Sequence, residues 1–178
     1  APLHTVVGPA HERWARVRSV SKFLGPDMCL ALTASDPDTA ERLALRLTPG
    51  TTWVSHILQR LAHALLTDDA VRAGIDQAGD HYAERNARFA ELLTERGLPV
   101  APGDGLNLWV PLPGPAAAVR EQLMRRGWLA RGGDDFFLAA EATNALRLTV
   151  HDLDDAEAAR LADDIAAAGG RTARRPAQ

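Results

Sequence analysis

The sequence predicts an α/β protein with two lobes, and three observations lead to this fold class. Over the first 66 residues, two segments of strand length are followed by two helical patterns. A single long helix is then expected from about Ala70 to Arg96, and a helix of that length is often a bridge between two lobes. After Gly97 short strands and helices alternate, which is typical of a small α+β lobe.

The composition fits a globular protein and excludes several classes of function. The 178 residues are 46% hydrophobic and 24% charged, with a net charge of −3, which disfavours a general nucleic-acid-coating role. A single cysteine excludes an internal disulfide framework, and no apolar run approaches the ~20 residues of a membrane span. Because no signal peptide is recognisable, we expect a cytoplasmic protein. The start at Ala1, with Met28 and Met124 as the only methionines, leads us to expect a fragment or a processed product.

The first lobe begins with two short strands and a helix. Residues 14–20, in which Arg16 and Arg18 alternate with apolar residues, predict a short buried strand, and residues 28–33 are a second, apolar run of strand length. The Gly- and Pro-containing loop 21–27 separates them. Asp36 is followed by proline, which predicts an N-cap and the first helical position of a helix that ends near Leu47.

Two helices follow. Thr51 or Thr52 is expected to cap the first of them, whose apolar face is formed by Val54, Ile57, Leu58, Leu61 and Leu65. The polar residues 67–69 predict the cap of the long helix, and Gly97 predicts its end.

The second lobe is expected to contain short elements. In order, these are strand 106–111, helix 115–126, strand candidates 128–131, 136–138 and 146–150, and a helix from Asp154 to about Ala168. Residues 169–178 are predicted to be an unstructured tail. The four tryptophans are predicted to be core residues.

Lys22 is the first candidate for chemistry, because it is the only lysine among 20 basic residues. It lies in the loop between the two strands, next to the hydroxyl side chains of Ser19 and Ser21. A partly desolvated lysine at a strand end can form an imine with a carbonyl, and hydroxyl groups beside it can bind a phosphate. The alternative, which the residues alone leave open, is an ordinary exposed loop lysine.

Four segments, taken in order, resemble one family. They are Arg-Ser-Val-Ser-Lys-Phe-Leu-Gly-Pro-Asp (18–27), Thr-Trp-Val-Ser-His (52–56), Gly-Asp-Gly-Leu-Asn-Leu-Trp (103–109) and Leu-Arg-Leu-Thr (146–149). The sequence resembles the aminotransferase-like domains of MocR-type regulators in the GntR superfamily, most closely the branch that regulates vitamin B6 salvage. The resemblance runs from about Pro2 to Ala167.

The resemblance implies the fold-type-I fold of enzymes that depend on pyridoxal 5′-phosphate (PLP). Residues 1–66 would be the end of the large PLP-binding domain, 67–97 a bridging helix, 98–168 a small α+β domain and 169–178 a disordered tail. It also implies a homodimer, and DNA binding only through a winged helix-turn-helix that would lie upstream of Ala1. The pyridine-binding Asp and the ring-stacking aromatic would lie upstream as well.

The resemblance also implies roles for individual residues. Lys22 would form the internal aldimine with PLP, Ser19 would bind the cofactor phosphate and Ser21 would support that loop. Arg147 would bind the carboxylate of an amino acid or another small ligand through its planar fork. The alternative for Arg147 is a strand-edge arginine paired with an acidic neighbour. The loop 51–56 would approach a cofactor, with Ser55 and His56 lining the cleft.

Cys29 departs from the family pattern, which has a phosphate-binding arginine at this position. Losing one charge-assisted contact of about 1.5–3 kcal/mol would weaken PLP binding ~10- to 100-fold. Cys29 itself is expected to be a buried small hydrophobic residue.

No metal site is predicted. His56 and His63 lie seven residues apart on one helix face without a third ligand, and residues 151–155 lack the glycine and distal glutamate of a calcium loop.

Three functions remain open. A PLP-binding sensor domain of a transcriptional regulator ranks first, before a PLP-dependent aminotransferase and a degenerate dimerisation scaffold.

Overall fold

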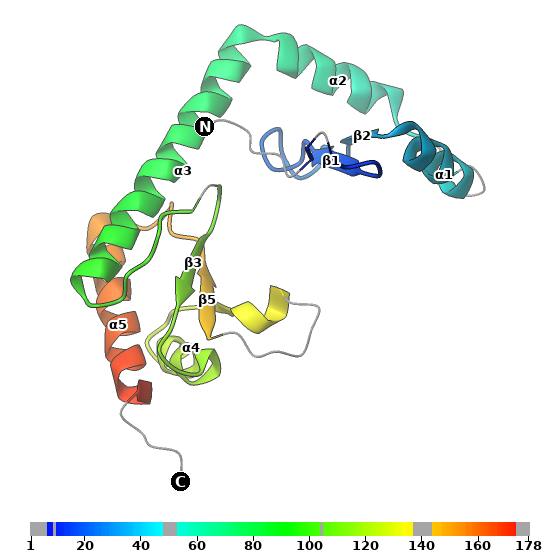
Figure 1. Ribbon diagram of the computed structural model, residues 1–178. Coiled ribbons are helices and arrows are strands. Elements are labelled where there is room, and N and C mark those ends of the chain that lie inside the picture. Colours follow the sequence, from blue (N-terminus) through cyan, green and yellow to red (C-terminus); the bar gives the residue numbers. More distant parts are fainter. Residues whose placement is uncertain (1–6, 9, 48–52, 104, 137–143, 174–178) are drawn as a thin grey trace. The chain divides into compact units, whose positions relative to one another are not determined.

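The computed structural model describes residues 7–8, 10–47, 53–103, 105–136 and 144–173. The chain divides into two compact units, Ala1–Gln77 and Ala78–Gln178, with helix α3 running across the boundary (Figure 1). Each unit is described by itself. None of the helices among the described residues is long and apolar enough to cross a membrane.

An antiparallel hairpin forms the start of the first unit. Strand β1 (Ala15–Ser19) pairs with β2 (Ala31–Ser35), and Ser19 lies opposite Ala31 where the pairing begins. Both predicted strands form, but the prediction that the first is buried is wrong, since Val17 of β1 is 64% exposed, and β2 starts later than the apolar run. The reason is a set of short-range turns: the Cys29 N–H donates to the Asp27 carbonyl at 2.8 Å, and the segment reaches extended pairing only after it.

Helix α1 (Pro37–Leu47) follows the hairpin and confirms the predicted cap. One Asp36 oxygen accepts the Thr39 N–H at 3.0 Å, and the other accepts the Trp14 N–H at 2.7 Å. The hydroxyl of Thr39 and the N–H groups of Trp14 and Thr39 lower the pKa of Asp36 to about 2. This buried carboxylate therefore caps α1 and holds the helix against the residue before β1.

Helix α2 (His56–Thr67) begins later than predicted. Ser55 is its N-cap, accepting the Leu58 N–H at 3.3 Å, so the prediction that Thr51 or Thr52 caps the helix is wrong. A small core joins α2 to the hairpin: Val20, Met28 and Ala62 are buried, with Leu24, Leu30 and Leu58 packed against them. Ile57 is 78% exposed, so only part of the predicted apolar face is covered.

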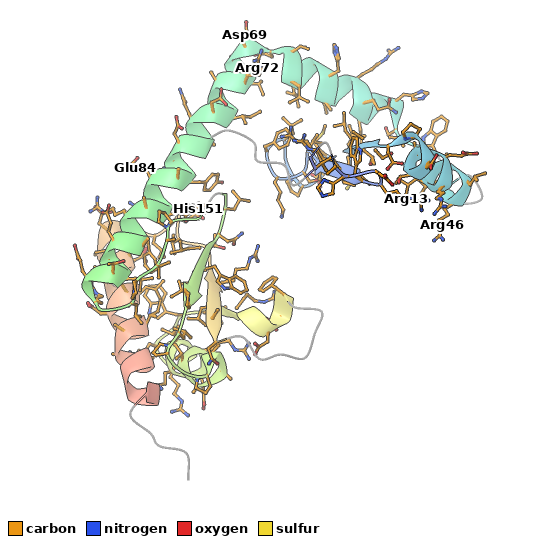
Figure 2. The ribbon with its side chains drawn as sticks, viewed as in Figure 1. Arg13, Arg46, Asp69, Arg72, Glu84 and His151 are labelled. Atoms are coloured by element: carbon orange, nitrogen blue, oxygen red, sulfur yellow. The ribbon has the colours of Figure 1, made fainter. Side chains whose placement is uncertain are left out.

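The long helix α3 (Asp69–Glu95) matches the predicted helix to within one residue at each end. Asp68 caps it by accepting the Ala70 and Val71 N–H groups at 2.8 and 3.1 Å. Asp69 and Arg72 form an exposed ion pair of 3.7 Å in its first turn (Figure 2). Gly97, at φ +80°, ends the helix as predicted.

A three-stranded antiparallel sheet lies at the centre of the second unit. The order is β3 (Leu108–Pro111), β5 (Ala145–Leu148) and β4 (Arg131–Gly132). Along the chain, helix α4 (Ala116–Met124) lies between β3 and β4, and the 3-10 turn η1 (Gly133–Phe136) lies between β4 and β5. Phe136 was predicted to begin a strand and instead ends this turn, because the chain turns away directly after the very short β4.

Helix α5 (Asp155–Ala173) closes the second unit and lies beside the C-terminal part of α3 (Figure 1). Arg88 pairs with Asp155 at 2.9 Å and Arg96 with Asp163 at 2.6 Å between the two helices. Asp154 caps α5 as predicted, in a reciprocal arrangement with Glu157 at 2.7 and 3.1 Å. The helix continues past Ala168, so residues 169–173 of the predicted tail are helical, and residues 174–178 lie outside the described residues.

One face of the sheet carries the core of the second unit. Its most deeply buried side chains come from the sheet and from helices α3, α4 and α5: Phe89, Leu93, Leu108, Val110, Val119, Leu123, Leu146 and Ile165. Trp128 packs against this core, whereas Trp53 is 77% exposed and Trp109 is 37% exposed. The prediction that all four tryptophans are core residues is therefore wrong for Trp53 and, in part, for Trp109. Trp14 is half-buried and is not among the residues of either core.

Candidate functional site

Lys22, the candidate for imine formation, lies in the turn that follows β1. Lys22 is exposed, which matches the alternative of an exposed loop lysine and not that of a partly desolvated one. The backbone around it forms a tight turn, in which the Phe23 and Leu24 N–H groups both donate to the Val20 carbonyl, at 3.2 and 2.9 Å. Val20 is 1% exposed and anchors this turn in the small core. The lysine therefore projects from a turn whose base is fixed by packing.

A chain of hydrogen bonds connects the two serines of this loop. The Ser19 hydroxyl donates to the Ser21 oxygen at 3.1 Å, and the Ser21 hydroxyl donates to the Met28 carbonyl at 2.9 Å. The Ser21 N–H also donates to the Ser19 oxygen, at 3.2 Å. Ser21 thus ties the two sides of the loop together, while the exposed Ser19 can turn its hydroxyl toward a ligand without breaking that tie.

Gly25 allows the loop to reverse direction. Its φ of +115° lies in a region that residues with a side chain rarely adopt, and its carbonyl accepts the Met28 N–H at 3.1 Å. The reversal brings Met28 into the core and back toward Ser21.

Cys29 is exposed, and the prediction that it is a buried small hydrophobic residue is wrong. The turn that places Met28 in the core turns the following side chain outward. Its thiol lies 3.7 Å from the Pro26 carbonyl, a weak contact that supplies no positive charge.

A surface cavity of about 470 Å³ lies on the first unit, between the hairpin and the start of α3. Its walls are apolar with three charged groups, and its lining is Arg18, Val20, Phe23, Leu32, Leu66, Arg72, Ile75 and Asp76. The site residues Ser19, Ser21 and Lys22 are not among the described residues that line it.

Arg147 lies in the central strand β5 of the second unit. Its side chain is half-buried, and its guanidinium carbon lies 4.5 Å above the centre of the Phe136 ring. No carboxylate among the residues that the structure describes forms an ion pair with it. The alternative of a strand-edge arginine paired with an acidic neighbour therefore has no support in the described part of the chain.

Three neighbours of Arg147 were not predicted as site residues from the sequence. Trp109 and Arg131 occupy the positions paired with it on β3 and β4, and Phe136 contacts both arginines. The alternation of apolar and polar residues in 146–150 is a local signal for Arg147, but none marks Trp109, because residues 108–110 are all apolar. No local signal marks Arg131, because its position depends on how β4 pairs with a strand farther along the chain.

The remaining predicted site residues have local roles. The Ser55 hydroxyl caps α2, and the His56 ring lies 5.3 Å from that of Trp53. In the described ranges, no three metal-ligating side chains come together. The structure brings Ser19, Ser21 and Lys22 together in one loop of the first unit, and Arg147 belongs to the second unit.

Comparison with known proteins identifies relatives over nearly the whole chain. The family model for aminotransferase class I and II matches residues 5–165. The vitamin B6 salvage pathway transcriptional repressor PtsJ of Salmonella typhimurium is 42% identical over 165 residues, which are 93% of this chain and 38% of PtsJ. The chain thus spans well under half the length of this relative.

Solved aminotransferases have the same fold. LysN, the α-aminoadipate aminotransferase of Thermus thermophilus, complexed with N-(5′-phosphopyridoxyl)-L-leucine, matches with a TM-score of 0.72 at 20% identity. That match covers 89% of this chain and 42% of LysN. The Pyrococcus horikoshii kynurenine aminotransferase, in complex with PMP, matches with a TM-score of 0.71 at 20% identity, over 84% of this chain and 39% of its own.

The fold is therefore the fold-type-I fold of these aminotransferases, as the sequence predicted. The family model covers all the segments on which the resemblance was based, including the lysine loop and the strand that carries Arg147. The chain belongs to the aminotransferase class I and II family.

Proposed function

We propose that this chain is part of the effector domain of a transcriptional regulator and binds PLP through Lys22. The observation that carries the proposal is the 42% identity to a vitamin B6 salvage repressor along 93% of the chain. The solved aminotransferases, at 20% identity, support the fold but not a choice of function.

The donor set of the lysine loop fits PLP. When bound, PLP supplies an aldehyde that an amine can attack and a ring that withdraws electrons from the attached group. Lys22 is the only lysine of the chain and is exposed on a turn that packing fixes at its base. Ser19 would hold the phosphate through its hydroxyl, and Ser21 would keep the loop closed through its bond to the Met28 carbonyl.

Arg147 would bind the ligand carboxylate in this proposal. A guanidinium presents a planar fork of N–H donors that matches a carboxylate. The Phe136 ring holds one face of that fork, and no described carboxylate competes for its N–H groups. The ligand would be an amino acid or another small carboxylate.

The resemblance to MocR-type regulators is the basis for the rest of the proposal. The domain would act as a homodimer in the cytoplasm, and DNA would be bound by a separate module of the protein. Ligand occupancy would then change the relative populations of two conformations that the DNA-binding module reads.

The test uses the full-length gene product, incubated with PLP, reduced with borohydride and digested for peptide mass spectrometry. We expect a pyridoxyl group on the peptide that contains Lys22, and none in Lys22→Arg. Failure to label this peptide in a folded protein would overturn the proposal and favour the scaffold.

An aminotransferase is the second candidate, because Lys22 and Arg147 are the residue types that transamination also needs. Incubation of the PLP-loaded protein with amino acids separates the two functions. Conversion of an amino acid to its keto acid, with transfer of the amino group to PLP, would favour the enzyme, whereas ligand binding without turnover would favour the sensor.

A further inference from the structure

Three side chains form one row across the sheet of the second unit. Trp109, Arg147 and Arg131 are directly paired positions on the three strands. The neighbouring paired positions, such as Val110 and Leu146, belong to the core face. Because successive residues of a strand face opposite sides, the row lies on the face away from the core.

Two positive charges in directly paired positions are unfavourable unless something compensates for them. Asp135 compensates for one of them, since its carboxylate accepts the Arg131 Nε–H at 2.9 Å. Within the described ranges, no other carboxylate forms an ion pair with either arginine. The Phe136 ring contacts both guanidinium groups, at 5.3 Å for Arg131 and 4.5 Å for Arg147. Among the described residues, Asp135 thus pairs with Arg131 alone, and the Phe136 ring is the contact that the two guanidinium groups share.

Both arginines keep donors that a ligand can use. A guanidinium has five N–H donors, and the bond to Asp135 uses only the Nε–H of Arg131. The Arg131 side chain is 67% exposed, so its terminal N–H groups are accessible. Because both guanidinium carbons lie close to the same ring, one small molecule can reach both of them.

The same face also offers an apolar surface beside the two arginines. Trp109 and Phe136 are in edge-to-face contact at 6.2 Å and 72°, and their exposed fractions are 37% and 41%. Methylene groups of a ligand can pack against these rings while its ends bind the arginines.

We propose that this face selects an aliphatic ligand with two carboxylates, one held by Arg147 and the second by Arg131. Arg131 is then a specificity-determining residue, and Asp135 orients it through Nε. This inference rests on the carboxylate-binding role of Arg147 in the proposed function and adds the class of ligand.

The test is a titration of the 15N-labelled 178-residue chain with glutarate, which has two carboxylates, and with butyrate, which has one. The Nε–H signals of Arg131 and Arg147 and the indole N–H of Trp109 report binding at the site. An exposed ion pair contributes little, so we expect glutarate to bind roughly two- to fivefold more tightly than butyrate. Arg131→Gln should abolish this preference and leave the affinity for butyrate unchanged.

Two further variants separate the possible failures. Arg125→Gln removes an exposed arginine that pairs only with Glu121 on α4, and it should leave both affinities unchanged. Arg147→Gln should abolish binding of both ligands. If it leaves butyrate binding intact, the proposed role of Arg147 fails.

If Arg147→Gln abolishes binding but Arg131→Gln does not change the preference for glutarate, only the present inference is overturned. If Arg131→Gln weakens the binding of glutarate and of butyrate equally, the inference is also contradicted, because Arg131 would then act only indirectly, through the Phe136 ring and Arg147. Arg131→Lys, which keeps the charge, should retain part of the preference. Unchanged signals from the core would show that each variant is folded.

Discussion

The hydroxyl of Ser21 donates a hydrogen bond to the backbone carbonyl of Met28, 2.9 Å away on the other side of the lysine loop. This bond links the turn that carries Lys22 to a residue that is buried in the core of the first unit. The position of the lysine backbone thus depends on a side chain next to it, and the two serines of the loop have different tasks.

Replacement of Ser21 by Ala should loosen the loop. It removes the bond to Met28 and leaves a part-buried carbonyl without that donor, which costs about 1 kcal/mol. Amide hydrogen exchange of residues 22–28 should become faster. Ser19→Ala is the matched control, because the bond to Met28 remains and exchange should change less. Equal acceleration in the two variants would show that the bond does not hold the loop.

Introduction of an arginine at position 29 should strengthen cofactor binding. The Cys29 side chain is exposed on the lysine loop and carries no positive charge, so an arginine has room to reach a phosphate bound there. One added charge-assisted contact predicts ~10- to 100-fold tighter PLP binding in Cys29→Arg. PLP titration of the full-length gene product, followed by absorbance, measures the change.

The control for that experiment is Cys29→Gln, which adds length without charge. It should bind PLP about as well as the natural protein. If the glutamine variant gains as much affinity as the arginine variant, the effect does not come from a contact with the phosphate.

The sequence predicted best those features that depend on neighbouring residues. Asp36 and Asp154 cap helices as expected, because a cap needs only a side chain and N–H groups two or three residues away. The lysine loop and its serines were found for the same reason, since Gly25 and the spacing of the motif are local.

Features that depend on distant pairing were predicted less well. Cys29 lies in an apolar run, yet a turn that buries Met28 leaves it exposed. Arg131 reaches Arg147 only because β4 pairs with β5, and nothing near Arg131 in the sequence sets that register. Trp53 was expected in a core, but it precedes α2 and does not belong to the small core that joins α2 to the hairpin, so it is exposed.

Asn86 should contribute to the stability of the second unit. It is 1% exposed, and its amide donates to the Gly105 carbonyl at 2.8 Å, which fixes the loop before β3. Asn86→Ala removes this bond inside the protein and should lower the free energy of unfolding by about 1–3 kcal/mol. Urea unfolding followed by circular dichroism measures the loss.

Asn107→Ala is the comparison for that variant. Its side chain accepts an exposed hydrogen bond from Thr149 at 2.9 Å, so its removal should cost less. Equal losses in the two variants would show that burial of Asn86 does not decide the effect.

Acid should weaken the link between α1 and the hairpin through Asp36. Hydrogen bonds from Thr39 and Trp14 lower its pKa to about 2, below the ~3.9 of an unfolded aspartate. The unfolded state therefore binds the proton first as pH falls, so the stabilisation is complete above about pH 4 and is lost toward pH 2.

Asp36→Asn should be less stable at pH 7, and its stability should fall less between pH 5 and pH 2. Urea unfolding at each pH, read from the backbone amide signal of Trp14, gives both slopes. Asp38→Asn removes an exposed carboxylate from the same helix and should keep the natural slope, whereas a natural slope in Asp36→Asn would refute the linkage.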